Sequence, residues 1–126
     1  MGPGELITAV HVPLFKADQR FAFDELARRR GDYALVGCGM LATCAGDRID
    51  GIRISFFSVG NTPTRAMGAE AALIGSSLDA ERIVAAQAAL ERDLAPPDSD
   101  EVPPAMRLHL ARVLLGRLLG RLKEGA

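Results

Sequence analysis

The sequence contains no tryptophan, and Tyr33 is its only tyrosine. Proteins that bind single-stranded nucleic acid use aromatic rings on which bases stack, and this composition predicts no such platform. Fifteen Lys and Arg residues are balanced by sixteen Asp and Glu residues, so the net charge is −1. Binding a phosphate backbone needs a net basic face. The composition therefore argues against a nucleic-acid partner.

Cysteine and histidine are also scarce, with two residues of each. Cys38 and Cys44 are six residues apart in a predicted strand, about 20 Å at ~3.3 Å per residue, which is too far for a disulfide. His11 and His109 are distant in sequence, and no Cys/His cluster with metal-site spacing occurs, so no metal is expected. Two lone thiols and no recognisable secretory signal favour the cytoplasm.

Long apolar runs are missing as well. None reaches the ~20 residues that would span a bilayer, so no membrane partner is expected. What remains is an ordinary globular composition, 48% hydrophobic and 25% charged over 126 residues. We expect a single domain over 1–126, with an exposed proline-rich and acidic loop at 96–104.

Hydrophobic periodicity predicts the secondary structure. Strands are expected at 4–13 and, as a hairpin with a Gly- and Asp-containing turn, at 33–46 and 52–60. Helices are expected at 21–30 with Gly31 as its stop, at 68–75, at 77–94 with Asp79 as its N-cap, and at 105–123. This pattern predicts an α+β domain in which a small antiparallel sheet of about three strands is backed by about four helices.

Four stretches share their order and spacing with a known family. They are "GELITAVHVP", "ELARRRGDYALVG", "VGNTPTRAMGAEAALIGSSLD" and "RLHLARVLLGRLL". From about Gly4 to Leu122 the chain resembles the C-terminal domain of the flavin-binding (medium) subunit of molybdenum hydroxylases, the carbon monoxide dehydrogenase and xanthine dehydrogenase group. The resemblance implies the same fold, a small antiparallel sheet backed by helices.

The resemblance also implies a cofactor context. A complete flavin subunit of that family has a preceding FAD-binding region whose glycine-rich loops hold the diphosphate, and the C-terminal domain closes over the isoalloxazine. We expect that region to be missing, because the only similar string, "GCGML", lies inside a predicted strand and fits no G-x-G-x-x-G. By resemblance, Arg28, Arg29, Asp32 and Tyr33 match the segment that approaches the flavin.

One departure from the family concerns the second strand of the hairpin. Where the family tends to have small glycines, this sequence has Phe56, Phe57 and Ser58. Two phenylalanines would fill that space or create a new apolar surface. A domain cut from a larger subunit leaves a bare apolar face, and the simplest partner for it is a second copy related by two-fold symmetry. We therefore expect a homodimer.

The candidate site residues each have a structural alternative. Arg28, Arg29 and Arg30 would close a helix, where cations favour the dipole. Asp32 would cap a turn or pair with an arginine. Tyr33 is either a core residue with its hydroxyl at the rim or a donor to a ligand carbonyl or enolate.

Three functions are compatible with these residues. The first is a cofactor-free biosynthetic enzyme, a cyclase or isomerase of a largely apolar small molecule. We prefer it because we expect the FAD-binding region to be missing and because glycines of the family are replaced. Its catalytic residues would be Tyr33, Asp32 and the general acid or base His11, and its substrate-binding residues Arg29, Phe56 and Phe57. The second is an accessory domain of a FAD-dependent molybdenum hydroxylase, docking onto a separate flavoprotein subunit. The third is a non-catalytic dimeric binding module.

Overall fold

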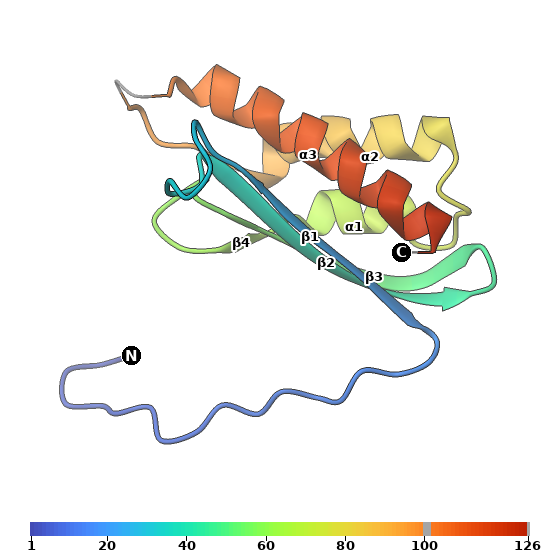
Figure 1. Cartoon of the computed structure of the whole chain (residues 1–126), viewed down its shortest axis with the longest axis horizontal. Helices are drawn as coiled ribbons and strands as arrows, with labels where there is room; N and C mark the ends of the chain where they lie inside the picture. Colours follow the sequence, from blue (N-terminus) through green and yellow to red (C-terminus); the bar gives the residue numbers. More distant parts are fainter. Residues whose placement is uncertain (100–101, 126) are drawn as a thin grey trace.

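A computed structural model describes residues 1–99 and 102–125. One antiparallel sheet in the order β1-β2-β3-β4 is covered on one face by three helices, while the N-terminal segment runs past the other face (Figure 1). The predicted α+β class is confirmed. The described elements are β1 (Gln19–Leu26), β2 (Val36–Ala45), β3 (Arg48–Phe57), β4 (Thr64–Arg65), α1 (Met67–Leu73), α2 (Ala80–Asp93) and α3 (Pro104–Glu124).

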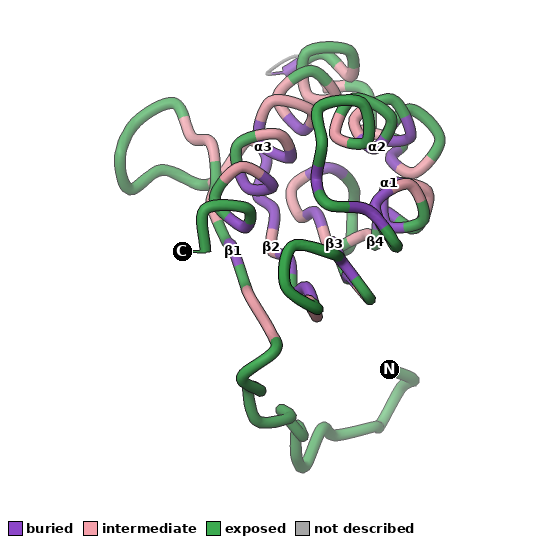
Figure 2. The backbone as a smooth tube through the Cα atoms, turned by 90° about the vertical axis from the view of Figure 1, so that its right-hand side faces the viewer, coloured by how far each residue is buried: buried purple, intermediate pink, exposed green. Residues whose placement is uncertain are grey.

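The core lies between the sheet and the helices (Figure 2). Alternate residues of the predicted hairpin point toward it, because side chains of a strand alternate between faces. The longest helix, α3, buries one stripe of leucines on the sheet. The buried residues of these elements are Val36, Cys38, Met40 and Ala42 of β2, Ile49, Ile52, Ile54 and Phe56 of β3, and Ala111, Leu114, Leu115, Leu118, Leu119 and Leu122 of α3.

The hairpin contains a β-bulge. Thr43 pairs with Gly51 and Cys44 with Ile49, so Asp50 is the extra residue on β3. A bulge of this kind changes which face the following residues occupy. Because of it, Ile49 and Ile52 are both buried although they are three residues apart.

The predicted helix at 21–30 is wrong, since residues 19–26 form β1. Every residue of β1 pairs with β2, and the face alternates from exposed Phe21 through buried Ala22 to exposed Phe23. Good helix formers gave the wrong prediction because pairing with a distant strand overrides local propensity. Gly31 does not stop a helix; it has φ +91° in a turn in which the Asp32 amide donates to the Arg29 carbonyl at 3.1 Å.

The predicted strand at 4–13 is also wrong. Residues 6–15 are extended, and no backbone hydrogen bond joins them to any other described residue. Their apolar side chains are exposed rather than half-buried. Alternation predicts a strand only where a second strand is available, and the sheet described here is built without this segment.

The remaining helices are confirmed. The Asp79 side chain accepts from the Arg82 amide at 2.9 Å and caps α2. α3 begins with Pro104 and ends before Gly125, which has φ +80°. In the predicted loop at 96–104, Pro97 and Asp98 are exposed and Val102 is buried, whereas Asp100 and Glu101 lie outside the described residues. No helix among residues 1–99 and 102–125 is long and apolar enough to cross a membrane.

Candidate functional site

The loop at 27–35, which joins β1 to β2, carries the residues singled out by the resemblance. It forms a shallow pocket of about 320 Å³ lined by Arg28, Gly31, Asp32, Tyr33 and Leu35. The side chain of Tyr33 is 99% exposed, so it is not the core residue of the structural alternative. A fully exposed tyrosine contributes little to the fold and is available for contact with another molecule.

Arg107 fixes the base of this loop. It lies in the first turn of α3, and its Nη1 donates to the Leu35 carbonyl at 3.3 Å and to the Ser58 carbonyl. The Leu35 amide donates to the Leu26 carbonyl at 2.7 Å, which closes the loop on β1. The Arg107 Nε is buried and has no partner among the described residues. Sequence reasoning missed Arg107, because its partners are 49 and 72 residues away.

On the side of the sheet away from the helices, which we call the open face, apolar side chains gather beside the exposed Arg53. This face presents Phe21, Phe23, Leu41 and Phe57, and a depression of about 560 Å³ lies over its middle. The rings of Phe23 and Phe57 stack at 5.9 Å with an interplanar angle of 10°. Phe57 covers Gly37, since a Cβ built there would be only 1.8 Å from the Phe57 Cζ. The glycine therefore makes room for the ring.

Phe56 and Phe57 do not form one apolar wall as expected. Phe56 is fully buried under the helices, whereas Phe57 is on the open face, because neighbouring residues of a strand point to opposite sides. His11 is exposed in the N-terminal segment and does not line the pocket of Tyr33. Arg29 is exposed and accepts the turn hydrogen bond from Asp32. The structure thus brings Asp32 and Tyr33 into one pocket and places His11, Phe56 and Phe57 elsewhere.

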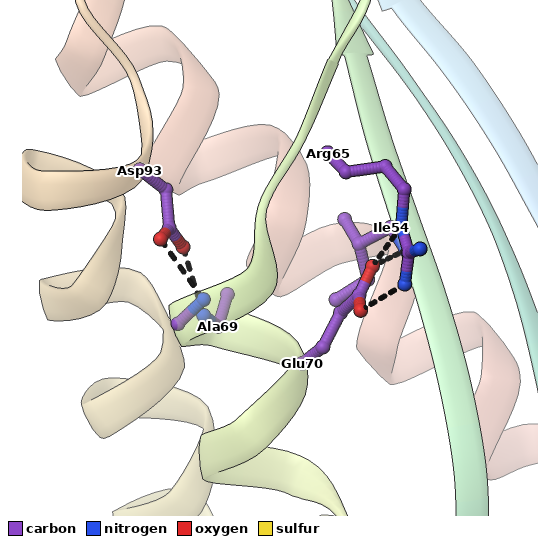
Figure 3. A network of polar contacts seen from close by, with 6 residues as sticks. Ile54, Arg65, Ala69, Glu70 and Asp93 are labelled. Atoms are coloured by element: carbon purple, nitrogen blue, oxygen red, sulfur yellow. Dashed lines mark hydrogen bonds and ion pairs between the residues drawn. The ribbon is translucent and has the colours of Figure 1, made fainter.

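A buried carboxylate lies between β3, β4 and α1 (Figure 3). Glu70 accepts from the Ile54 amide at 2.8 Å and from Arg65 Nε and Nη2 at 3.1 and 2.5 Å. The hydrogen bond and the negative charge of Glu70 raise the pKa of Arg65 above its ordinary value. Because both oxygens of Glu70 are engaged, we interpret this group as a structural tie and not as a general acid.

A second carboxylate holds the start of α1. Asp93, the last residue of α2, accepts from the Gly68 and Ala69 amides at 2.9 and 2.8 Å (Figure 3). These amides would otherwise be unpaired at the helix N-terminus. No group of three His, Cys, Asp or Glu side chains within the described part of the chain is placed to hold a metal ion.

Cys38 is predicted to be chemically inert in the folded protein. Burial raises the pKa of its thiol to about 12, so roughly one thiol in ten thousand is ionised at pH 8, and only the thiolate is nucleophilic. Mass spectrometry after iodoacetamide treatment at pH 8 should find Cys38 unmodified in native protein and modified in guanidinium chloride. Rapid native modification of Cys38 would contradict this.

The raised pKa of Cys38 also makes the stability of the protein depend on pH. The pKa of the unfolded thiol is near its ordinary value of 9.0, while burial raises the pKa of the folded thiol to about 12. The contribution of Cys38 to stability is therefore fully present below pH 9 and is lost as the pH rises toward 12.

Comparison with known proteins identifies the fold and the family. A family model described as the CO dehydrogenase flavoprotein C-terminal domain matches residues 21–122. The carbon monoxide dehydrogenase medium chain of Afipia carboxidovorans is 33% identical over 124 residues, which are 98% of this chain and 43% of that relative. The 6-hydroxypseudooxynicotine dehydrogenase complex subunit alpha of Paenarthrobacter nicotinovorans is 34% identical over 120 residues, 94% of this chain and 40% of the relative.

Solved structures of related proteins have the same fold as this chain. Reconstituted CO dehydrogenase from Oligotropha carboxidovorans has a chain that superimposes with a TM-score of 0.82 at 30% identity, over 91% of this chain and 40% of that one. Quinoline 2-oxidoreductase from Pseudomonas putida 86 gives a TM-score of 0.78 at 30% identity, over 86% and 38% of the two chains. The chain therefore spans less than half the length of the relatives it matches.

These relatives correct two expectations. A protein without a cofactor was expected, but the matching family is a domain of a flavoprotein. A cyclase or isomerase was preferred, but the relatives are subunits of dehydrogenases and an oxidoreductase, which favours the accessory domain. The match over residues 21–122 and the superposition on CO dehydrogenase together show that this chain belongs to the CO dehydrogenase flavoprotein C-terminal domain family.

Proposed function

We propose that this chain acts as the C-terminal domain of the flavoprotein subunit of a molybdenum hydroxylase-type oxidoreductase, where its loop at 27–35 contacts one side of the flavin. The observation that carries the proposal is the exposure of Tyr33 on a loop whose base is fixed by Arg107. A ring that is exposed but attached to a rigid base can meet a ligand with little loss of entropy. Family membership supplies the ligand class.

The residues present fit one edge of a flavin but not its diphosphate. Helix N-termini are the usual diphosphate sites. Here the α1 N-terminus is occupied by the Asp93 carboxylate, the α2 N-terminus is capped by the Asp79 carboxylate, and α3 begins with Pro104 directly after its N-cap residue Pro103. We infer that the diphosphate is held by a flavin-binding region that lies outside the family domain, which matches residues 21–122 of this chain.

In such an assembly the flavin would supply the two-electron redox chemistry. The residues of this chain would cover and orient it. The Tyr33 ring would pack against the isoalloxazine and exclude water there, and its hydroxyl is a hydrogen-bond donor. Asp32 is beside it in the same pocket and would bring a negative charge close to the ring.

The single tyrosine provides a direct test. Protein labelled with 3-fluorotyrosine has one ¹⁹F resonance, because Tyr33 is the only tyrosine. The labelled chain would be mixed with the FAD-loaded flavin-binding portion of the Afipia carboxidovorans medium chain, meaning the part of that chain outside its match to this one. We expect the Tyr33 resonance to shift, and to shift further with FAD than with the FAD-free portion.

Two variants serve as controls. Tyr33→Phe should keep FAD affinity near that of the unaltered chain, whereas Tyr33→Ala should weaken FAD binding by the assembly about 2–10-fold, the usual value of one aromatic contact. A Tyr33 resonance that is unchanged while the labelled chain is bound to the FAD-loaded portion would contradict the proposed function.

A further inference from the structure

Two unfavourable features meet at the base of the loop at 27–35. The Arg107 Nε is buried and donates to no described residue, and an unpaired buried donor destabilises a folded protein. Ser58, whose carbonyl accepts from Arg107, has φ +60°, in the left-handed region that residues other than glycine rarely adopt. Unpaired donors and strained backbone of this kind collect at functional sites. The contact between Arg107 and Ser58 is therefore a candidate for a functional role.

Arg107 joins the segment before β2 to the segment after β3. Its Nη1 donates to the carbonyl of Leu35, where the loop at 27–35 ends, and to the carbonyl of Ser58, directly after β3. Leu35 also lines the pocket that contains Tyr33. The start of α3 and this loop lie at the same end of the molecule (Figure 1). One guanidinium group therefore holds the backbone that carries Tyr33.

Arg107 is itself attached to well-packed parts of the molecule, whereas Tyr33 is not. The Arg107 amide donates to the Pro103 carbonyl at 3.0 Å and closes the first turn of α3. Val59, next to Ser58, is buried in the core. Tyr33 is 99% exposed, so packing does not hold its ring. Its position depends on the backbone of the loop, and the position of that backbone depends on Arg107.

We propose that Arg107 is a positioning residue for the flavin contact, which sets where Tyr33 meets the isoalloxazine by holding the Leu35 and Ser58 carbonyls together. The inference rests on the proposed function and adds to it a residue that touches no ligand. A loop that is positioned in advance loses less entropy when the flavin binds. The unpaired Nε and the strained Ser58 are retained because they belong to the contact that fixes the loop.

A double-variant cycle tests whether Arg107 acts through Tyr33. Arg107→Met, Tyr33→Ala and their combination would be made in the full chain, and FAD affinity would be measured with the flavin-binding portion of the Afipia carboxidovorans medium chain. We expect Arg107→Met to weaken FAD binding about 2–10-fold, as Tyr33→Ala does. The combined variant should bind FAD no more weakly than Tyr33→Ala, because residues that act as one unit are not additive. Losses that multiply in the combined variant would overturn the proposal.

Two further variants separate positioning from a general loss of stability. In Arg107→Lys the ammonium can still donate to both carbonyls, because a single nitrogen makes both bonds in the structure. This variant should bind FAD within about twofold of the unaltered chain. Arg112→Met is the matched control, since Arg112 is on the same helix but pairs with Glu91 of α2. It should leave FAD affinity unchanged, and equal effects of Arg107→Met and Arg112→Met would contradict the positioning role.

Hydrogen exchange tests the loop base even if Arg107→Met fails to fold. The Leu35 amide donates to the Leu26 carbonyl at 2.7 Å, at the point that Arg107 holds. In the unaltered chain and in Arg107→Lys we expect this amide to exchange slowly, as amides of a stable region do. Exchange at the rate of an unstructured peptide in the unaltered chain would show that the loop base is not fixed, and the proposal would be wrong.

The outcomes distinguish this inference from the proposed function. If the Tyr33 resonance shifts with FAD and Tyr33→Ala weakens FAD binding, but folded Arg107→Met binds FAD as the unaltered chain does, the positioning role is refuted and the proposed function stands. If the Tyr33 resonance is unchanged while the chain is bound to the FAD-loaded portion, the proposed function fails and the positioning role fails with it.

Discussion

Replacing Phe56 by alanine is expected to lower the free energy of unfolding by roughly 3–5 kcal/mol, the usual cost of removing a fully buried phenylalanine. Its ring is completely buried on β3, beside Cys38 of β2 and Thr64 of β4. Alanine would leave a cavity that a sheet bonded on both sides cannot close by shifting. Urea unfolding followed by circular dichroism measures the loss.

Phe57→Ala is the matched control. The same residue type, one position along the same strand, is on the open face and only partly covered. Removing the Phe57 ring should lower the free energy of unfolding by about 0.5–1.5 kcal/mol, because its stacking contact with Phe23 is lost. A smaller loss of buried apolar area adds to this. Equal losses for the two variants would contradict the assignment of the two rings to opposite faces of the sheet.

The second large effect is expected from Glu70→Ala. The Ile54 amide would lose its acceptor in a buried place, which costs about 1–3 kcal/mol, and α1 would lose one of its hydrogen bonds to β3. Glu70→Gln keeps an oxygen that can accept from Ile54 and should be clearly less destabilising. Urea unfolding of both variants measures the difference.

Arg65→Ala removes the ion pair of Glu70 but keeps its hydrogen bond with the Ile54 amide, so it separates these two contributions to stability. The Arg65 side chain is half exposed, so its ion pair with Glu70 is screened by water and contributes little. We expect Arg65→Ala to destabilise the protein less than Glu70→Ala. If Arg65→Ala were the more damaging change, the ion pair and not the Ile54 hydrogen bond would be the larger contribution of Glu70 to stability.

Elements determined by local sequence were predictable. The hairpin of β2 and β3, the cap at Asp79 and the long apolar stripe of α3 follow from periodicity and capping residues near one another in the chain. β1 was not predictable in this way. Its residues favour a helix locally, and only the ladder with β2, up to 24 residues away, makes it a strand.

In the candidate site, too, some residues could be predicted from the sequence and others could not. Asp32 and Tyr33 were found through the family resemblance, and the structure places both in the pocket of the loop at 27–35. Arg107 was missed, because nothing near it in sequence shows that it binds Leu35 and Ser58. The assumption that Phe56 and Phe57 act together failed because neighbouring strand residues face opposite sides. The extra residue Asp50 in the hairpin had no sequence signal that we recognised.

The ring of Phe57 over Gly37 has a consequence for how this sequence can vary. The two residues are direct partners across β2 and β3, and the space above Gly37 is already filled by the ring. A larger residue at position 37 therefore requires that the Phe57 ring turn aside or that a smaller residue replace it. We therefore expect substitutions at positions 37 and 57 to be correlated among related sequences, so that a larger residue at one position accompanies a smaller residue at the other.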